Sequence, residues 1–362
     1  MLENMLKEYN LPEIPSVEEC KRLLQEYEYG YLPEKPEEFK FETLETNLRS
    51  CGGRAVETLV RLYGKLKGED FSFPIKVTLP KHDEGQPAEK RPLFVQINFR
   101  PDVPDIYQPT EEIFDNGFAI ASFCYKDVTT DNNDFSNGLA KTIYPDGVKK
   151  DGNGTGKIMM WAWAAMRTLD YMEIDHKDEI DFDNVAVCGH SRLGKTALVT
   201  GAFDDRFKFV FSNDSGCGGA AIERNHHDKI PGKQGFTAET IEVITKVFPF
   251  WFCENYKQYA GKPETMPHDQ HFLGACVYPR HLYIASAELD YWADQTNEFM
   301  CAYAVSKYYE ENGKTGLVTQ DRLPETDENL HDGTIGYHRR TGAHYFSRQD
   351  WIRYMAFIKK HM

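Results

Sequence analysis

The period of apolar and polar positions changes several times along the chain, and each change predicts a different element. Residues 16–19, Ser-Val-Glu-Glu, have the spacing of a helix capping box, and apolar residues then recur at helical intervals. We therefore expect a helical extension over residues 1–45. Two stretches of alternating apolar and polar residues follow, Val56 to Tyr63 and Phe71 to Leu79. They predict an antiparallel hairpin.

From Pro92 onward, short apolar segments alternate with helical patterns. The segments that predict strands are 93–97, 118–123, 185–188, 207–211, 282–285 and 333–338. Helical spacing is found at 157–172, around Thr196 and at 349–360. This alternation predicts a mostly parallel sheet covered on both faces, and a leading hairpin is typical of the α/β-hydrolase fold. We expect such a domain over residues 46–362, with a substrate-shaping insertion at about 217–275.

Composition and charge exclude several classes of protein. Of the 362 residues, 41% are hydrophobic and 13% aromatic, which is inconsistent with a disordered chain. The formal net charge of −15 provides no basic footprint for nucleic acid or an anionic membrane. The longest apolar run, Ile158 to Met166, is about half of the ~20 residues that span a bilayer. The amino terminus is acidic and lacks an apolar secretory core, so we expect a cytoplasmic protein.

The cysteines and histidines predict neither disulfides nor a metal site. The eight cysteines are spread along the chain without a CxxC pair, which predicts buried free thiols. Neither His268 nor His271 has a third clustered ligand, so zinc is not expected. The sequence suggests no cofactor.

Residues 189–196, Gly-His-Ser-Arg-Leu-Gly-Lys-Thr, fit two motifs that support different chemistry. They match G-x-x-x-x-G-K-[ST], in which backbone N–H groups hold phosphates, Lys195 reaches them and Thr196 holds Mg²⁺. They also resemble the nucleophile elbow G-x-S-x-G of serine hydrolases, with the second glycine one residue late. A P-loop normally follows the first strand of its domain, whereas this motif follows at least four predicted strands. The elbow, with Ser191 as nucleophile, is therefore the favoured interpretation.

The hydrolase interpretation requires an acid and then a histidine downstream of the nucleophile. Asp290 follows the penultimate predicted strand, where this fold carries its acid. His344 lies on a glycine-containing loop just before the last helix, where the general base is expected. His338 lies inside the last predicted strand and is expected to be structural.

The wider motif set resembles the glucuronoyl esterases of carbohydrate esterase family fifteen, over roughly residues 90–362. The matching segments are 189–195, 213–221 with Arg224, 251–252, 267–271, 279–280 and 290–294. The resemblance implies an α/β-hydrolase that cleaves esters of the glucuronic acid carboxyl group without metal or cofactor. A small-molecule or oligosaccharide ester would then be the partner, while the alcohol half and the oligomeric state stay open. Relatives described only as acetylxylan-esterase-like share the motif.

The resemblance also implies roles for individual residues. Ser191 matches the nucleophile and His344 the base, while Arg192 matches an arginine of the oxyanion hole. The family's acid has two placements, which correspond here to Asp290 and to Asp214. The residues that match substrate-binding positions are Lys195, Trp292 and Arg224. The family's sugar-binding Gln and Glu have no clear equivalent between Thr240 and Phe250.

Three classes of function therefore compete. A serine esterase is favoured, with Asp290 as the acid and Asp214 as a partial substitute. A P-loop nucleotide-binding protein is the alternative, and a catalytically silent carbohydrate-binding relative is the third. Arg192 and Lys195 are expected to form a local positive patch beside the nucleophile.

Overall fold

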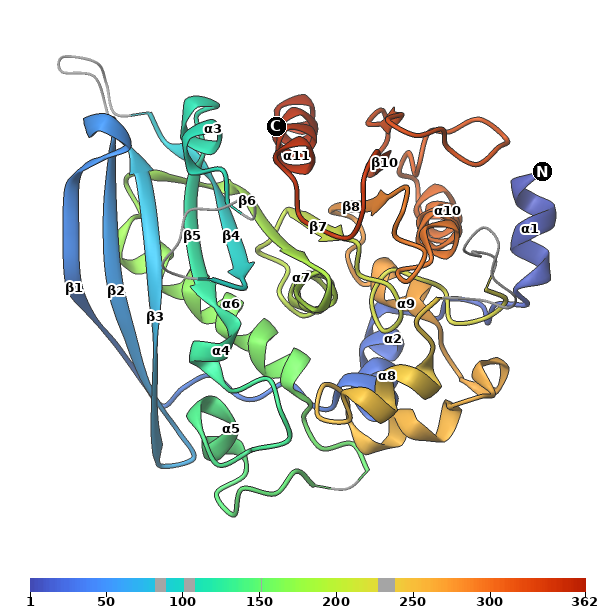
Figure 1. Ribbon diagram of the computed structural model, residues 1–362, viewed down its shortest axis with the longest axis horizontal. Coiled ribbons are helices and arrows are strands. Elements are labelled where there is room, and N and C mark those ends of the chain that lie inside the picture. Colours follow the sequence, from blue (N-terminus) through green and yellow to red (C-terminus); the bar gives the residue numbers. More distant parts are fainter. Residues whose placement is uncertain (82–88, 101–107, 151, 227–237) are drawn as a thin grey trace.

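A single mixed sheet organises the protein. The computed structural model describes residues 1–81, 89–100, 108–150, 152–226 and 238–362. In these residues ten strands pair in the order β1-β2-β3-β5-β4-β6-β7-β8-β10-β9 (Figure 1). Their bounds are β1 Glu38–Ser50, β2 Ala55–Leu66, β3 Glu69–Pro80, β4 Arg91–Asn98, β5 Ala119–Cys124, β6 Ile180–His190, β7 Phe209–Asn213, β8 His281–Ala287, β9 Asn329–Leu330 and β10 Ile335–Arg340. Strands β4, β5, β6, β7, β8 and β10 run parallel to one another, whereas β1, β2, β3 and β9 pair antiparallel. This is the α/β-hydrolase arrangement that the sequence predicted.

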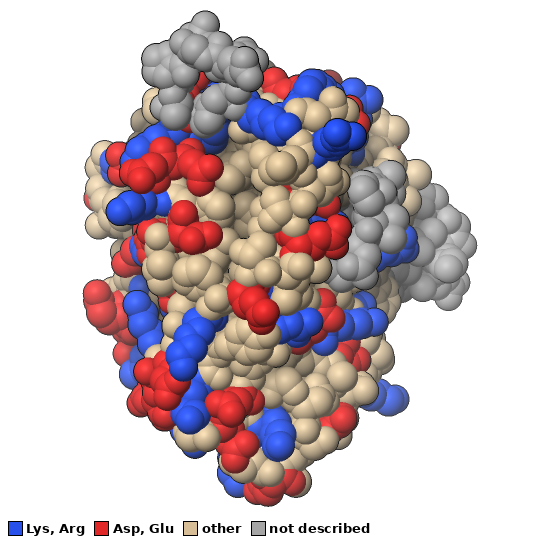
Figure 2. Space-filling view, turned by 90° about the vertical axis from the view of Figure 1, so that its left-hand side faces the viewer, with Lys and Arg blue, Asp and Glu red and all other residues tan. Residues whose placement is uncertain are grey.

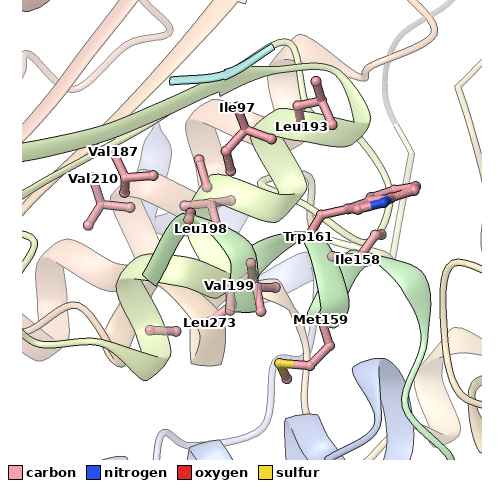
Figure 3. Close-up of a cluster of buried hydrophobic side chains, with 14 of the residues drawn as sticks. Ile97, Ile158, Met159, Trp161, Val187, Leu193, Leu198, Val199, Val210 and Leu273 are labelled. Carbon is pink, nitrogen blue, oxygen red and sulfur yellow. The ribbon is translucent and has the colours of Figure 1, made fainter. Parts of the chain in front are cut away.

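The central strands are apolar throughout because both of their faces are covered. Helices α3 and α11 lie against one face, whereas α6, α7 and α10 cover the other (Figure 1). Figure 3 shows side chains of α6 and α7 packed with strand residues such as Val187 and Val210. The helix bounds are α1 Leu2–Glu8, α2 Val17–Leu24, α3 Thr110–Asp115, α4 Tyr125–Val128, α5 Gly138–Ile143, α6 Lys157–Asp175, α7 Arg192–Phe203, α8 Ile241–Val247, α9 Gln270–Ala275, α10 Gln295–Glu311 and α11 Arg348–His361.

The predicted hairpin forms from β2 and β3, and its strands are longer than the pattern indicated. The turn is Lys67-Gly68, and both residues have positive φ, at 54° and 79°. Positive φ at both central positions is the geometry of a type I′ turn, whose twist matches that of the strands. The alternation of apolar and polar residues stops at Tyr63 and resumes at Phe71, so the sequence predicted strands that end short of the turn.

The amino-terminal segment differs from the expected extension. Helices end at Tyr29, and residues 38–45 belong to β1, which pairs along β2 at the sheet edge. Most of β1 is exposed, so only Phe39 and Phe41 carry the apolar alternation that marks a strand. From α1, which lies beside α10, the chain passes α2 and reaches the opposite edge of the sheet at β1 (Figure 1).

The insertion before β8 packs against this amino-terminal segment. It contains α8, α9 and the 3₁₀ turns η3 (Glu254–Tyr259) and η4 (Pro263–Thr265). The buried carboxylate of Glu28 joins the two segments, since it lies 2.9 Å from His268 Nε2 and accepts a 2.9 Å bond from Gln270 Nε2. His271 Nε2 lies 2.9 Å from the Pro12 carbonyl. His268 and His271 thus anchor the insertion to the amino-terminal segment.

The cysteines are free thiols, as the sequence predicted, and the surface carries charges of both signs. All eight cysteines are unpaired, and every one except the half-buried Cys51 is buried. On the face shown in Figure 2, acidic and basic side chains are interspersed. Among the described residues, no helix combines the length and hydrophobicity needed to cross a membrane.

Candidate active site

Ser191 lies on a strained turn between β6 and α7. Its backbone angles, φ 58° and ψ −127°, fall in a region that residues other than glycine rarely adopt. A Cβ on Gly189 would lie 2.1 Å from the Leu193 carbonyl oxygen, so only glycine fits there. Gly194 lies against β7, where an added Cβ would be 3.0 Å from the Asn213 carbonyl oxygen. Residues 189–194 therefore have the backbone geometry of a nucleophile elbow, although the second glycine comes one residue late.

The same residues do not form a phosphate cradle. Lys195 is buried, and its ammonium donates to the carbonyls of Ser215 and Cys217 and, at 3.0 Å, to Glu239 Oε2. An ammonium has three donors, and these contacts use all of them. The Thr196 hydroxyl donates to the Arg192 carbonyl within α7 at 2.8 Å instead of facing a metal.

This geometry predicts that Mg-ATP does not stabilise the protein. A ligand at 100 times its Kd stabilises a folded protein by ~2.7 kcal/mol, which raises Tm by several degrees. We expect the Tm of the wild-type protein in millimolar Mg-ATP to stay within about 1 °C of its value in Mg²⁺ alone, in a thermal unfolding assay. A saturable increase that Lys195→Arg abolishes would contradict the elbow interpretation.

The structure brings His344 and Asp290 together. His344 lies on the loop after β10, and its Nδ1 is 2.5 Å from Asp290 Oδ2 on the loop after β8. Backbone bonds join the two loops, since Leu289 N donates to the Gly342 carbonyl at 2.9 Å. The Asp290 side chain is 3% exposed, whereas that of His344 is 40% exposed and can meet a substrate. The expected pairing of acid and histidine is therefore present.

Asp214 is close to these groups but has a different partner. Its Oδ2 accepts a 3.1 Å bond from Arg340 Nη2, and its buried Oδ1 has no hydrogen bond within the described residues. Burial, and next to it the charge of Asp290, raises the pKa of Asp214 well above its usual range. Unlike Asp290, Asp214 makes no described hydrogen bond with His344.

Arg340 stabilises the loop that carries His344. Its guanidinium donates to the carbonyls of Ala343 and Tyr345, which flank His344, and its Nε donates to both oxygens of Asp350. Asp350 Oδ1 also lies 2.8 Å from His338 Nε2, which is fully buried. His338 is thus structural, as the sequence predicted.

His190, Asp214 and His344 bring potential metal-ligand atoms within 4.8 Å of one another. Two of these residues already have strong partners, because Arg340 binds Asp214 and Asp290 binds His344. A guanidinium on a carboxylate opposes a cation at the same oxygen. Burial, and next to it the charge of His344, lowers the pKa of His190 to about 3, so this imidazole is neutral. The contacts of Asp214 with Arg340 and of His344 with Asp290 therefore disfavour a cation at this cluster.

A cavity of about 230 Å³ opens beside Ser191 and His344. Drug-sized ligand pockets begin at about 300 Å³, so this volume suits a single small group. Its walls are Ser191, Arg192, Lys195, Asp214, Ser215, Gly216, Glu239, Phe248, Trp251, Trp292, Ala293 and His344. Trp292 is 48% exposed at the rim. A larger cavity, of about 680 Å³, lies between the amino-terminal segment and α10, but it contains neither Ser191 nor His344.

Glu239 is a pocket residue that the sequence interpretation missed. It immediately precedes the range Thr240 to Phe250, in which no equivalent of the family's sugar-binding residues was expected. Glu239 faces Lys195, and its backbone N donates to the Trp292 carbonyl at 2.8 Å. The pair also changes the expected electrostatics, because Glu239 neutralises Lys195 and Asp131 neutralises Arg192. The expected positive patch is therefore two ion pairs.

Arg224 was expected to bind substrate, and the structure gives it another role. It is buried outside the pocket, and its terminal nitrogens donate to the carbonyls of Asn10 and Met266 at 2.6 and 2.7 Å. Arg224 Nε also lies 3.3 Å from Asp269. The family resemblance of segment 213–221 with Arg224 implied substrate binding, but the side chain points toward the amino-terminal segment.

Comparison with known proteins identifies the family. The profile described as "Glucuronyl esterase, fungi" matches residues 65–313, well over half of the chain. The chain belongs to the glucuronoyl esterase family. Carbohydrate esterase MZ0003, from an unknown prokaryotic organism, is 31% identical over 95% of this chain and 84% of its own length. A 4-O-methyl-glucuronoyl methylesterase of Schizophyllum commune is 27% identical over 82% of this chain and 69% of its own.

Solved structures of glucuronoyl esterases have the same fold. The glucuronoyl esterase from Solibacter usitatus superposes with a TM-score of 0.82 at 29% identity, over 95% of this chain and 91% of that one. A promiscuous esterase of the same family from a marine bacterial metagenome gives 0.80 at 31% identity, over 96% and 91%. The protein is therefore a carbohydrate ester hydrolase, and the nucleotide-binding alternative has no support.

Proposed function

We propose that this glucuronoyl esterase family member hydrolyses esters of the glucuronic acid carboxyl group through a Ser191–His344–Asp290 triad. The observation that carries the proposal is the 2.5 Å contact between His344 and Asp290 at a pocket that also contains the strained Ser191. Acid, histidine and nucleophile lie on three different loops at one end of the sheet, as in serine hydrolases of this fold.

The chemistry proceeds in two steps. Ser191 Oγ attacks the ester carbonyl carbon while His344 Nε2 takes its proton, and His344 then gives that proton to the leaving alcohol. Water, deprotonated by His344, next cleaves the acyl-enzyme and releases glucuronate. Asp290 fixes the imidazole through Nδ1 and stabilises the imidazolium that forms in each step.

Arg192 is the proposed donor to the oxyanion. Its backbone N–H begins α7, where helix geometry leaves the first N–H groups without intrahelical acceptors. Its guanidinium contributes from the same residue, because the side chain also lines the pocket. Removing one such donor typically costs about 10²–10³ in turnover.

The sugar is proposed to lie between Lys195–Glu239 and Trp292. A carboxylate accepts hydrogen bonds from sugar hydroxyls, and a partly exposed indole offers an apolar face to the ring. Since both cations of the pocket are paired with carboxylates, the pocket suits the neutral ester better than the anionic product. Product release would then be favoured by charge.

A panel of esters tests the substrate class. We expect the highest kcat/KM with benzyl and methyl esters of glucuronic acid, lower values with aryl acetates and the lowest with acetylated xylo-oligosaccharides. Assays would follow acid release at constant pH with purified protein. A preference for acetylated xylo-oligosaccharides would redirect the proposal to an acetylxylan esterase that uses the same triad.

Glu239→Gln is expected to raise KM for the methyl ester of glucuronic acid by about 10-fold or more, with little change for an aryl acetate. Glutamine keeps the size and the contact with Lys195, but it removes the charge from the proposed hydrogen bond to the sugar. Hydrogen bonds to charged groups are worth ~1.5–3 kcal/mol, which corresponds to about 10- to 150-fold. Steady-state kinetics on both substrates provide the measurement. Equal effects on the two would mean that Glu239 has no role in sugar recognition.

A further inference from the structure

We infer that Asp131 is the positioning residue that fixes the Arg192 guanidinium and the Trp251 ring in the active site. This inference rests on the proposed function, because it assigns the orientation of the oxyanion arginine to a residue behind the pocket. Asp131 itself is not among the pocket-lining residues, and its side chain is only 8% exposed. It lies on the loop after α4, about sixty residues before the nucleophile.

Asp131 receives donors from three separate parts of the chain. Its Oδ2 is ion-paired with Arg192 Nη1 and also accepts a 2.9 Å bond from the Tyr125 hydroxyl. Its Oδ1 accepts a 2.8 Å bond from Trp251 Nε1. Burial, and next to it the Asp131 carboxylate, raises the pKa of Tyr125, which keeps this hydroxyl protonated as a donor. Both carboxylate oxygens are thus bonded, and two of the three donors belong to pocket-lining residues.

The contacts of Arg192 show what Asp131 contributes. The guanidinium carbon lies 4.7 Å from the centre of the Trp251 ring, and Trp251 stacks on Phe248 at 3.9 Å. The Trp251 ring restrains the Arg192 guanidinium only in the direction perpendicular to the ring plane. The ion pair with Asp131 fixes how the guanidinium is turned within that plane. Arg192 Nε is buried and has no hydrogen bond partner among the described residues. The Asp131 contact is therefore the polar anchor of this side chain.

The loop that carries Asp131 is itself rigidly held. Lys157, at the start of α6, donates to the carbonyls of Thr130 and Asp134 on either side of Asp131. Asn137 Oδ1 accepts a 3.0 Å bond from Thr130 N. These contacts place the carboxylate on a fixed support, which is what a positioning residue requires.

The chemical consequence concerns the moment at which the oxyanion forms. A preorganised donor stabilises that charge because it need not reorient as the charge develops. In Asp131→Asn, the carboxamide cannot accept from Arg192, Tyr125 and Trp251 together, since its nitrogen is a donor. Arg192 then loses the negative charge that it is paired with, and either Arg192 or Trp251 also loses its acceptor, while the size of residue 131 is unchanged.

The test compares Asp131→Asn with Asp134→Asn, which makes the same change on an exposed residue of the same loop. We expect Asp131→Asn to lower kcat by about 10- to 100-fold on both methyl glucuronate and 4-nitrophenyl acetate, and to raise KM several-fold on the glucuronate alone because Trp251 is loosened. Asp134→Asn should stay within twofold of wild type. The pH dependence of kcat should be unaltered, because His344 is not touched.

A double-mutant cycle with Arg192→Ala distinguishes positioning from a general structural role. If Asp131 acts through Arg192, Asp131→Asn should change kcat less than twofold in the Arg192→Ala background. An equal loss in both backgrounds, or near wild-type kcat in Asp131→Asn, would overturn the inference. Should Asp131→Asn unfold, Asp131→Glu keeps the charge but moves it by one methylene, and the same cycle applies.

The outcomes also separate this inference from the proposed function. Because 4-nitrophenyl acetate reports the oxyanion without the sugar, the cycle can be read even if the wild-type protein does not cleave glucuronate esters. If the protein does not prefer glucuronate esters but the cycle shows the expected coupling between Asp131 and Arg192, only the substrate class is rejected. If it does prefer glucuronate esters but the effects of Asp131→Asn and Arg192→Ala on kcat are independent, only the role of Asp131 is rejected.

Discussion

Ser191→Ala is expected to lower the turnover of every ester substrate by about 10⁴- to 10⁶-fold, the range found when a serine hydrolase loses its nucleophile. The elbow presents this side chain to the pocket, and alanine leaves no atom that can form the acyl-enzyme. Stability should change little, since the half-exposed side chain loses one oxygen and the positive φ is occupied by a residue with a Cβ in both proteins. We expect a Tm within about 2 °C of wild type, in line with the small effects of most surface substitutions.

Two companion variants make this result interpretable. His344→Ala should lose activity to a similar extent, because nucleophile and base act as a unit. Ser50→Ala, a half-buried serine at the end of β1, should keep wild-type kinetics. A well-folded Ser191→Ala protein that retained more than a trace of the activity, purified free of contaminating esterases, would remove Ser191 from the mechanism.

The sequence could predict the parts of the site whose geometry is written locally. The elbow follows from residues 189–194, because a buried strand, two glycines and a helix are adjacent in the chain. Asp290 and His344 could be placed because this fold fixes the chain order of nucleophile, acid and histidine. Their contact then follows from the parallel neighbours β8 and β10, whose ends carry the two loops.

The parts that sequence missed depend on long-range contacts without local signatures. Asp131 lies in a polar loop of asparagines and aspartates that resembles any turn, and only the folded chain brings it to Arg192. Glu239 became visible as a pocket residue only through its contact with Lys195. Arg224 was expected at the substrate from the family resemblance, but a matching motif does not fix the direction of a long side chain. The match to the P-loop motif was misleading because a sequence motif does not specify the backbone conformation of its residues, such as the positive φ of Ser191.

The second large effect is expected at the acid. Asp290→Asn should lower turnover by about 10²- to 10⁴-fold, the range found when serine hydrolases lose the acid of the triad. Asparagine keeps the size of the side chain but removes the charge that stabilises the imidazolium, and it no longer favours the correct tautomer of His344. At 2.5 Å, the contact between Asp290 and His344 is shorter than the ~2.7–2.9 Å that is usual for a charge-assisted N–H···O hydrogen bond. Initial rates on an aryl acetate measure this loss without interference from sugar binding.

Asp214→Asn should be far milder, with turnover within about 10-fold of wild type. Asp214 makes its hydrogen bond to Arg340 instead of to His344, and asparagine keeps nearly the size and shape of the aspartate side chain. The amide oxygen can still accept from Arg340, which keeps the loop of His344 in place. The turnover of the double variant is expected to be lower than that of either single variant. In Asp290→Asn, Asp214 is the carboxyl that remains near His344, and the double variant removes it as well. If instead Asp214→Asn were the more damaging change, the acid after β7 would be the one that serves His344, and Asp290 would only hold the imidazole in the free enzyme.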